Sequence, residues 1–235
     1  MQVSRCFFQE AELARQGTVA RTQEMRTEEA KARLAQAALT LFATDGYEAT
    51  SLAAISLKAG FSRTLAQYHY SDKSALALEL LEARILRDNH LELLDCPDDA
   101  PPEQAWQALI QHLSEVTEYY GRLHCNTSQS TTLRGEMAIH AAAMMGADAR
   151  LSAHVAHLTH DLILRIARLL SICRDGGMIP AQTDVHAMAV LHVHSIWGLA
   201  LALFVNPKGV RQVKAALHQI YVLLEALRID ERPAP

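Results

Sequence analysis

The chain has 235 residues, of which half are hydrophobic and only 6% aromatic, and its formal net charge is -4. This length allows one large or two smaller domains, the abundance of Ala and Leu favours helices, and the acidic balance argues at first against nucleic-acid binding. The four cysteines are far apart without CxxC pairing, which argues against disulfides or a cysteine zinc site and for a reducing cytoplasm.

Residues 1–25 show no strong hydrophobic periodicity, and we expect them to form a flexible N-terminal arm. No signal peptide is expected there, because charged side chains interrupt any apolar core: Arg5, Glu10, Glu12, Arg15 and Arg21. Met25 stands directly before the first strongly periodic helix and is an alternative start of the protein.

Three helices are expected in the next segment. The first begins at Thr27 and ends at Gly46. The second is short, is capped by Ser51 and closes at Gly60, and a third helix of about six residues follows a cap at Ser62.

A fourth helix is expected from Asp72 to about Leu94, and a hinge rich in turn residues follows at Cys96–Pro102. The hinge separates the first hundred residues from the rest of the chain. Further helices are expected at about 103–122, 134–145, 149–175, 184–205 and 208–228. No strand-like alternation of useful length is present, so the predicted fold class is all-α.

The segment Met188–Val205 carries no charge and approaches the length of a membrane span. However, His192, His194 and Ser195 lie in its middle. A helix that is apolar on all sides can also be the buried centre of a soluble bundle, and that interpretation is favoured.

The last helix has apolar residues spaced 3, 4, 3, 4, 3 from Val210 to Leu227, which is the seam of a coiled coil. Such a seam needs a partner helix. A two-fold copy of the last two helices would form a four-helix bundle. The predicted homodimer interface comprises Val213, Leu217, Ile220 and Leu224.

Residues 51–70 have the spacing of a helix-turn-helix motif: a supporting helix, a tight turn at Gly60 and a second short helix. Arg63 can bond guanine and Gln67 suits adenine, while Tyr68 can donate to a phosphate oxygen. The candidate DNA-binding residues are Ser51, Ser62, Arg63, Thr64, Gln67, Tyr68, His69 and Lys73. A helical hairpin without any ligand has the same spacing, so a helical interaction module remains an alternative.

Residues 27–76 also resemble the DNA-binding domain of the TetR/AcrR family of one-component repressors. The resemblance rests on Asp45-Gly46-Tyr47, Ala49-Thr50-Ser51, Ala59-Gly60, Tyr68-His69-Tyr70 and Lys73. It implies a DNA-binding domain at 26–76, a helical effector-binding and dimerisation domain at 77–235, and a homodimer on a palindromic DNA operator. The family often has a tyrosine where Gln67 stands, and its usual phenylalanine is Tyr70 here.

The charge of this segment differs from that of the whole chain. Residues 26–76 carry six Lys or Arg and five Asp or Glu side chains. Positive charge near the helix-turn-helix can act locally even on an acidic protein, but it predicts weak non-specific affinity.

A small-molecule effector is expected among the middle helices, where aromatic, Met and His side chains would surround a cavity. The candidate pocket residues are Trp106, His112, Tyr119, Tyr120, His140, Met144, His157 and Trp197. A metal-sensing regulator is the alternative, because His154, His157 and His160 recur on one helix. No cofactor is expected, and no motif of a hydrolase, metalloprotease or phosphate loop indicates an enzyme.

Overall fold

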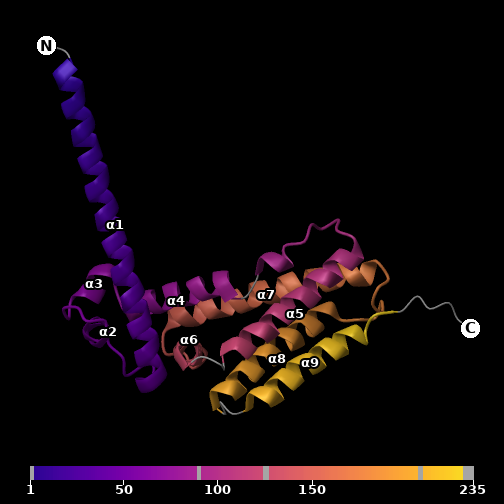
Figure 1. Cartoon of the computed structure of the whole chain (residues 1–235). Helices are drawn as coiled ribbons and strands as arrows, with labels where there is room; N and C mark the ends of the chain where they lie inside the picture. Colours follow the sequence, from indigo (N-terminus) through magenta and orange to yellow (C-terminus); the bar gives the residue numbers. More distant parts are fainter. Residues whose placement is uncertain (1–2, 89–90, 124–126, 206–208, 230–235) are drawn as a thin grey trace, which may run out of the picture.

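The computed structural model describes residues 3–88, 91–123, 127–205 and 209–229, with side chains described for 22–83, 91–119, 130–202, 209 and 211–229. Within these ranges the chain is all-helical, as predicted (Figure 1). The first four helices are α1 (Val3–Asp45), α2 (Leu52–Lys58), α3 (Leu65–His69) and α4 (Lys73–Asp88). They are followed by a 3-10 helix (Leu91–Leu94), α5 (Pro102–Leu123), α6 (Thr127–Met144), α7 (Ala149–Asp175), α8 (Val185–Val205) and α9 (Val210–Glu225).

The described side chains form two apolar cores. One core is built by α1 to α4 together with the end of α6 and the start of α7, and its fully buried members include Phe42, Ile55 and Leu81. The other core is built by α5, α7, α8 and α9 around Trp106 and Leu169. The end of α6 and the start of α7 thus belong to the core of the N-terminal helices, so the two halves of the chain are packed against each other.

The first helix is longer than the sequence predicts. Residues 3–25, expected to be a flexible arm, continue α1, whose N-terminal part extends away from the rest of the molecule (Figure 1). Thr27 lies inside this helix rather than at its start, and its hydroxyl donates to the carbonyl of Gln23 one turn earlier. The helix is long because residues 3–45 contain no proline and only one glycine, so no residue ends it before Asp45.

Helix α6 crosses α1 at very close range. A Cβ atom added to Gly135 of α6 would overlap the backbone carbonyl of Leu39 in α1. Glycine is therefore required at this position to let the two backbones meet. The crossing places α6 directly on the helix that supports α2 and α3.

Other boundaries differ in detail. The helix expected at 72–94 is α4, ending at Asp88, followed by a separate 3-10 turn. Helix α6 begins at Thr127, seven residues before the expected start at 134. The bounds of α7 match the prediction at both ends.

Helix α8 is the one helix of the described residues that is long and apolar enough to cross a membrane by length and composition alone. It packs against α7 on one side and α9 on another. Its residues Ala189, Val193 and Ala200 are buried in the C-terminal core, whereas Leu191 and Leu201 are exposed. The helix therefore has one face in the core and one apolar face on the surface of the single chain.

The regular seam of α9 faces the interior of its own subunit. Leu217 is fully buried, and Val213 and Leu224 are nearly so, because α5 and α8 of the same chain cover them. These three side chains of the predicted dimer interface are therefore already covered within one chain, and the fourth, Ile220, is half-buried. On the outer side of α9, Val222 and Leu223 are exposed.

Candidate functional site

The helix-turn-helix unit (residues 51–70) begins at the predicted cap. The Ser51 hydroxyl accepts a hydrogen bond from the backbone N–H of Ala54, which satisfies one orphan donor of α2. The turn at Gly60 has a φ of +79°, which glycine adopts without strain. Both local signals predicted from the sequence are confirmed.

Two contacts that hold this turn were missed by the sequence analysis. Arg33 of α1 donates to the carbonyl of Ala59 at 2.6 Å, and its guanidinium lies 4.3 Å from the ring centre of Phe61. Ser56 is fully buried, and its hydroxyl accepts the N–H of Ala66 at 2.8 Å, which ties α2 to α3. A buried serine between apolar residues was the only sequence signal for the second contact.

The outward side of α3 carries the predicted base-reading residues. Arg63, Thr64 and Gln67 are exposed, and Tyr68 exposes 83% of its surface. His69 is half-buried, and its ring meets that of Tyr68 edge-on at 5.2 Å.

Ser62 does not cap α3. The N-cap is Thr64, which makes no side-chain cap hydrogen bond, and the Ser62 hydroxyl lies 3.4 Å from that of Thr64. Because α3 is only five residues long, its position depends on tertiary contacts more than on its cap.

Lys73 is engaged inside the protein rather than presented to a ligand. Its ammonium group donates to the carbonyls of Tyr47 at 2.6 Å and Glu48 at 3.2 Å, and it lies 4.3 Å from the Tyr47 ring centre. These bonds fix the turn after α1, and a phosphate contact of Lys73 would have to compete with them. Tyr70 is similarly internal: its hydroxyl donates to Glu79, and burial is the largest of the causes that raise its pKa.

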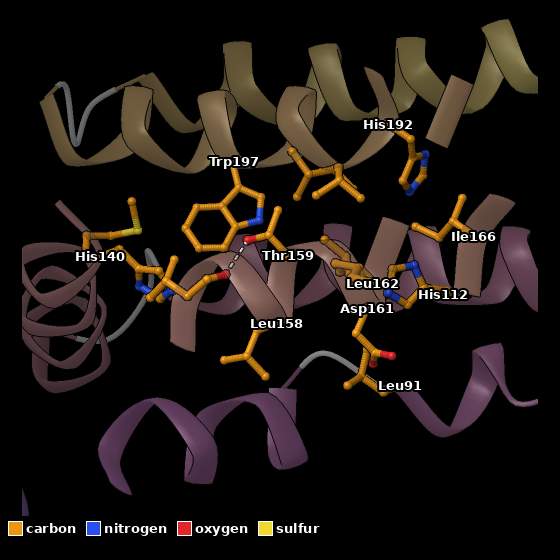
Figure 2. Close-up of a pocket in the computed structure, with 15 residues that line it drawn as sticks. Leu91, His112, His140, Leu158, Thr159, Asp161, Leu162, Ile166, His192 and Trp197 are labelled. Carbon is orange, nitrogen blue, oxygen red and sulfur yellow. Dashed lines mark hydrogen bonds between the residues drawn. The ribbon is translucent and has the colours of Figure 1, made fainter. Parts of the chain in front are cut away.

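An internal cavity of about 60 Å³ lies between α5, α6, α7 and α8 (Figure 2). Its walls are mostly aliphatic, and the polar lining residues are His112, His140, Thr159, Asp161 and His192. In Figure 2, His112 and His192 lie at one end of the cavity, and His140 and Trp197 lie at the other.

The structure brings together three of the eight predicted pocket residues: His112, His140 and Trp197. Trp106 is buried but points elsewhere, and its indole N–H donates to Glu225 at 3.2 Å. Met144 and His157 are exposed, and Tyr119 packs on the C-terminal core outside the cavity. The side chain of Tyr120 lies outside the described residues.

His192 was missed as a pocket residue. It is 4% exposed, its ring centre lies 6.3 Å from that of His112, and its Nε2 has no hydrogen-bond partner among the described residues. Burial, aided by His112, lowers the pKa of His192 to about 4, so the ring is neutral at pH 7. Its position in an apolar segment was the available signal, because a buried polar group in such a helix calls for a partner.

Three other polar residues of the lining, His140, Thr159 and Asp161, have hydrogen-bond partners within the chain. His140 contacts the carbonyl of Glu136 through Nδ1 at 3.0 Å, and its ring meets Trp197 edge-on at 4.4 Å. The Thr159 hydroxyl donates to the carbonyl of Val155. Asp161 accepts a hydrogen bond from Nε of Arg165 at 2.8 Å, so its negative charge is paired.

A junction cluster (Asp72, Ser74, Asp148 and Arg150) joins the start of α4 to the start of α7. Ser74 donates to Asp148, which also caps α7 by accepting the N–H groups of Arg150 and Leu151. Arg150 lies 2.8 Å from Asp72, which accepts the N–H of Ala75 in the first turn of α4. These bonds lower the pKa of both aspartates, with Ser74 the main cause for Asp148 and the Ala75 N–H for Asp72.

The histidines considered for a metal site are dispersed. His154 Nε2 lies 3.7 Å from a Glu82 carboxylate oxygen, whereas His157 and His160 are exposed. Within the described part of the chain, no group of three or more His, Cys, Asp or Glu side chains is placed to hold a metal ion.

Residues 34–80 match the family model for bacterial regulatory proteins of the tetR family. The chain is 26% identical over 210 residues to the HTH-type transcriptional regulator AcrR of Shigella flexneri. The matched region covers 88% of this chain and 93% of AcrR.

Solved structures share the fold over most of the chain. The SmeT–triclosan complex has a TM-score of 0.64 at 19% identity and covers 88% of this chain and 95% of its own; SmeT comes from Stenotrophomonas maltophilia. A TetR-family transcriptional regulator from Marinobacter aquaeolei VT8 has a TM-score of 0.63 at 18% identity, with 86% and 92% of the two chains covered.

Proposed function

This chain belongs to the TetR family of DNA-binding transcriptional regulators, a family without enzymatic activity, and from that premise we propose that it is a cytoplasmic, dimeric repressor released from a palindromic operator by a small molecule. Residues 26–76 form the DNA-binding domain in this proposal, and residues 77–235 bind the effector and dimerise. The observation that carries it is the rigidly held helix-turn-helix unit with an exposed, polar α3.

The DNA-binding part of the proposal rests on the contrast between the two sides of α3. Ala66 is buried and bonded to α2, whereas Arg63, Gln67 and Tyr68 are exposed on the outer side. A helix presented in this way can enter the major groove, with Arg63 bonding guanine, Gln67 bonding adenine and Tyr68 donating to phosphate. Ser51, at the start of α2, and Thr64, at the start of α3, are placed at helix ends from which they would add contacts to the DNA.

The effector part of the proposal rests on the cavity. SmeT, which shares the fold, was solved with triclosan and is described as the repressor of a multidrug efflux pump. The cavity here has about 60 Å³, well below the roughly 150 Å³ of an engineered cavity that binds benzene. An organic effector must therefore push the walls apart, and the enlarged state is the one that it stabilises.

Two cavity walls reach the DNA-binding domain: α6, which crosses α1, and α7, which meets the start of α4. Val155, Leu158 and Ile166 of α7 line the cavity, and Asp148 at its start is bonded to Ser74 of α4. Displacement of α7 by the effector would move α4 and change the spacing of the two helix-turn-helix units in a dimer. The effector then weakens operator binding in proportion to its different affinities for the two states.

The proposed dimer uses the outer faces of α8 and α9. Leu191 and Leu201 of α8 and Val222 and Leu223 of α9 each expose 40–61% of their surface in the single chain. Burying these side chains against a two-fold copy would form a four-helix bundle of the kind that the sequence suggests.

The test is footprinting of the purified protein on the DNA that flanks its own gene. We expect protection of a palindrome whose half-sites are one helical turn or a multiple of it apart. The matched control is the double variant Arg63→Ala/Tyr68→Ala, which should keep its helical content and lose the protection. Absence of any protected palindrome at low salt would count against the proposal.

A further inference from the structure

We propose that the effector of this cavity is an uncharged, largely apolar molecule with one hydroxyl group, and that His192 is the residue that selects it. The inference rests on the proposed function, because it names the chemical class of ligand for the same cavity. It is carried by the placement of His192 and by the pairing of every charged group in the cavity wall.

His192 is a polar residue of the wall with a ring nitrogen that a ligand can still satisfy. It lies on α8, is almost completely buried and faces the cavity, and its Nε2 has no hydrogen-bond partner among the described residues. A buried polar atom without a partner costs free energy that a ligand can recover. The ring can present either a donor or an acceptor at Nε2, and a hydroxyl group complements both forms.

The wall does not supply a counter-ion for a charged ligand. No lysine or arginine lines the cavity among the described residues, so a carboxylate ligand would have to protonate His192. That protonation is opposed by burial and by His112, which lower the pKa of His192 to about 4. The other titratable residues of the lining are His112 from α5, His140 from α6 and Asp161 from α7.

A cationic ligand is served no better. The carboxylate in the wall, Asp161, is already bonded to Arg165, which also pairs with Asp95 of the linker before α5. A cation would have to displace Arg165 to obtain an ion pair. The remaining walls, with Val116, Leu162 and Ile196 among them, offer only apolar contact.

The experiment compares four small probes of similar size on the full chain: para-cresol, toluene, benzoate and benzylamine. Binding is measured by titration calorimetry at pH 7.5 for the natural protein, His192→Phe and His192→Gln. His186→Phe is the matched control, because His186 lies on the same helix and is exposed. Opening the cavity costs the same for all four probes, so the ratio of two affinities isolates the contribution of the polar group.

We expect para-cresol to bind about tenfold more tightly than toluene, and more tightly than either charged probe, because one net hydrogen bond has this value. His192→Phe should reduce the ratio to about one, His192→Gln should retain part of it, and His186→Phe should leave it unchanged. Equal binding of para-cresol and toluene, tighter binding of a charged probe, or no binding of para-cresol at its solubility limit would each overturn the inference. Operator binding, measured in the same preparations without probe, reports separately on the proposed function.

Discussion

The hydroxyl of Ser74, in the first turn of α4, donates a 2.5 Å hydrogen bond to the carboxylate of Asp148, which caps α7. The same hydroxyl lies 3.1 Å from the hydroxyl of Tyr47, in the turn after α1. One buried serine thus joins the DNA-binding domain to the helix that forms a wall of the cavity. Removal of this hydroxyl tests whether the junction couples the two domains.

A double-mutant cycle of Ser74→Ala and Asp148→Ala should give a coupling of about 1.5–3 kcal/mol in the free energy of unfolding, the value of a hydrogen bond to a charged group. Urea unfolding of the four proteins at one protein concentration measures it. Ser114→Ala, at an exposed serine of α5, combined with Asp148→Ala should be additive. Additivity of the Ser74 pair as well would show that the contact does not join the domains energetically.

The crossing of α1 and α6 leads to a second prediction. Gly135→Ala should destabilise the fold by about 1–3 kcal/mol, because its methyl group overlaps the Leu39 carbonyl and the helices must separate. Gly198→Ala is the control, since a Cβ at Gly198 of α8 meets nothing within 4 Å in the chain. There the substitution should stabilise the helix by about 0.5–1 kcal/mol. Thermal unfolding distinguishes the two, and a harmless Gly135→Ala would contradict the close crossing.

His192 predicts a pH dependence of stability. Its pKa is about 4 in the folded chain and about 6.5 in an unfolded one, so between these values the unfolded chain binds a proton that the folded chain does not. Stability therefore falls as the pH falls through 6.5 and levels off below 4. From pH 7.5 to pH 5.5, the natural protein should lose about 1 kcal/mol more than His192→Phe. Equal losses in denaturant titrations of the two proteins would show that His192 is not held neutral by burial.

Paired substitutions can distinguish the proposed interface on α8 and α9 from the core. Leu191→Asp and Leu223→Asp should shift the mass measured by light scattering toward the monomer while the helical content is kept, because both side chains are exposed in one chain. Leu217→Asp should instead unfold the protein, since it places a charge in the core. A stable dimer in both exposed variants would place the interface elsewhere.

Single substitutions on α3 should separate base reading from phosphate contact. Arg63→Ala should weaken operator binding by about 1–3 kcal/mol and relax the preference at one base pair. Tyr68→Phe removes only a hydroxyl group, so it should weaken binding to all sequences alike and leave the salt slope unchanged. Arg211→Ala, at an exposed arginine of α9, is the control for loss of positive charge. Binding measured at several salt concentrations gives both quantities, and a normal affinity of Arg63→Ala would contradict its role.

The sequence predicted those features that depend on neighbouring residues. Ser51 as a cap, Gly60 as a left-handed turn and the exposure of Arg63 and Gln67 follow from local backbone chemistry, and the structure has all of them. The all-helical fold follows from composition and from the spacing of apolar residues. None of these features requires knowledge of which helix packs on which.

Features that depend on tertiary packing could not be predicted in the same way. The seam of α9 shows that one side must be covered, but only the fold shows that α5 and α8 of the same chain cover Leu217. Trp106 and Met144 fit a cavity by residue type, yet one is bonded to Glu225 and the other is exposed. The sequence indicates a phosphate contact for Lys73, but only the fold shows that the carbonyl of Tyr47 accepts a hydrogen bond from it.

When a cavity is smaller than its ligand, the measured affinity differs from the strength of the contacts that the ligand makes, because opening the cavity costs free energy. Every effector bears the same cost of displacing α7, so its measured affinity is the strength of its contacts reduced by that shared amount. A substitution that loosens α7 at Asp148 or Arg150 would then increase the affinity of all effectors by one factor and leave their ranking unchanged. Under the proposed mechanism, chemical selectivity would therefore reside in the cavity walls, and overall sensitivity would reside at the junction with α4.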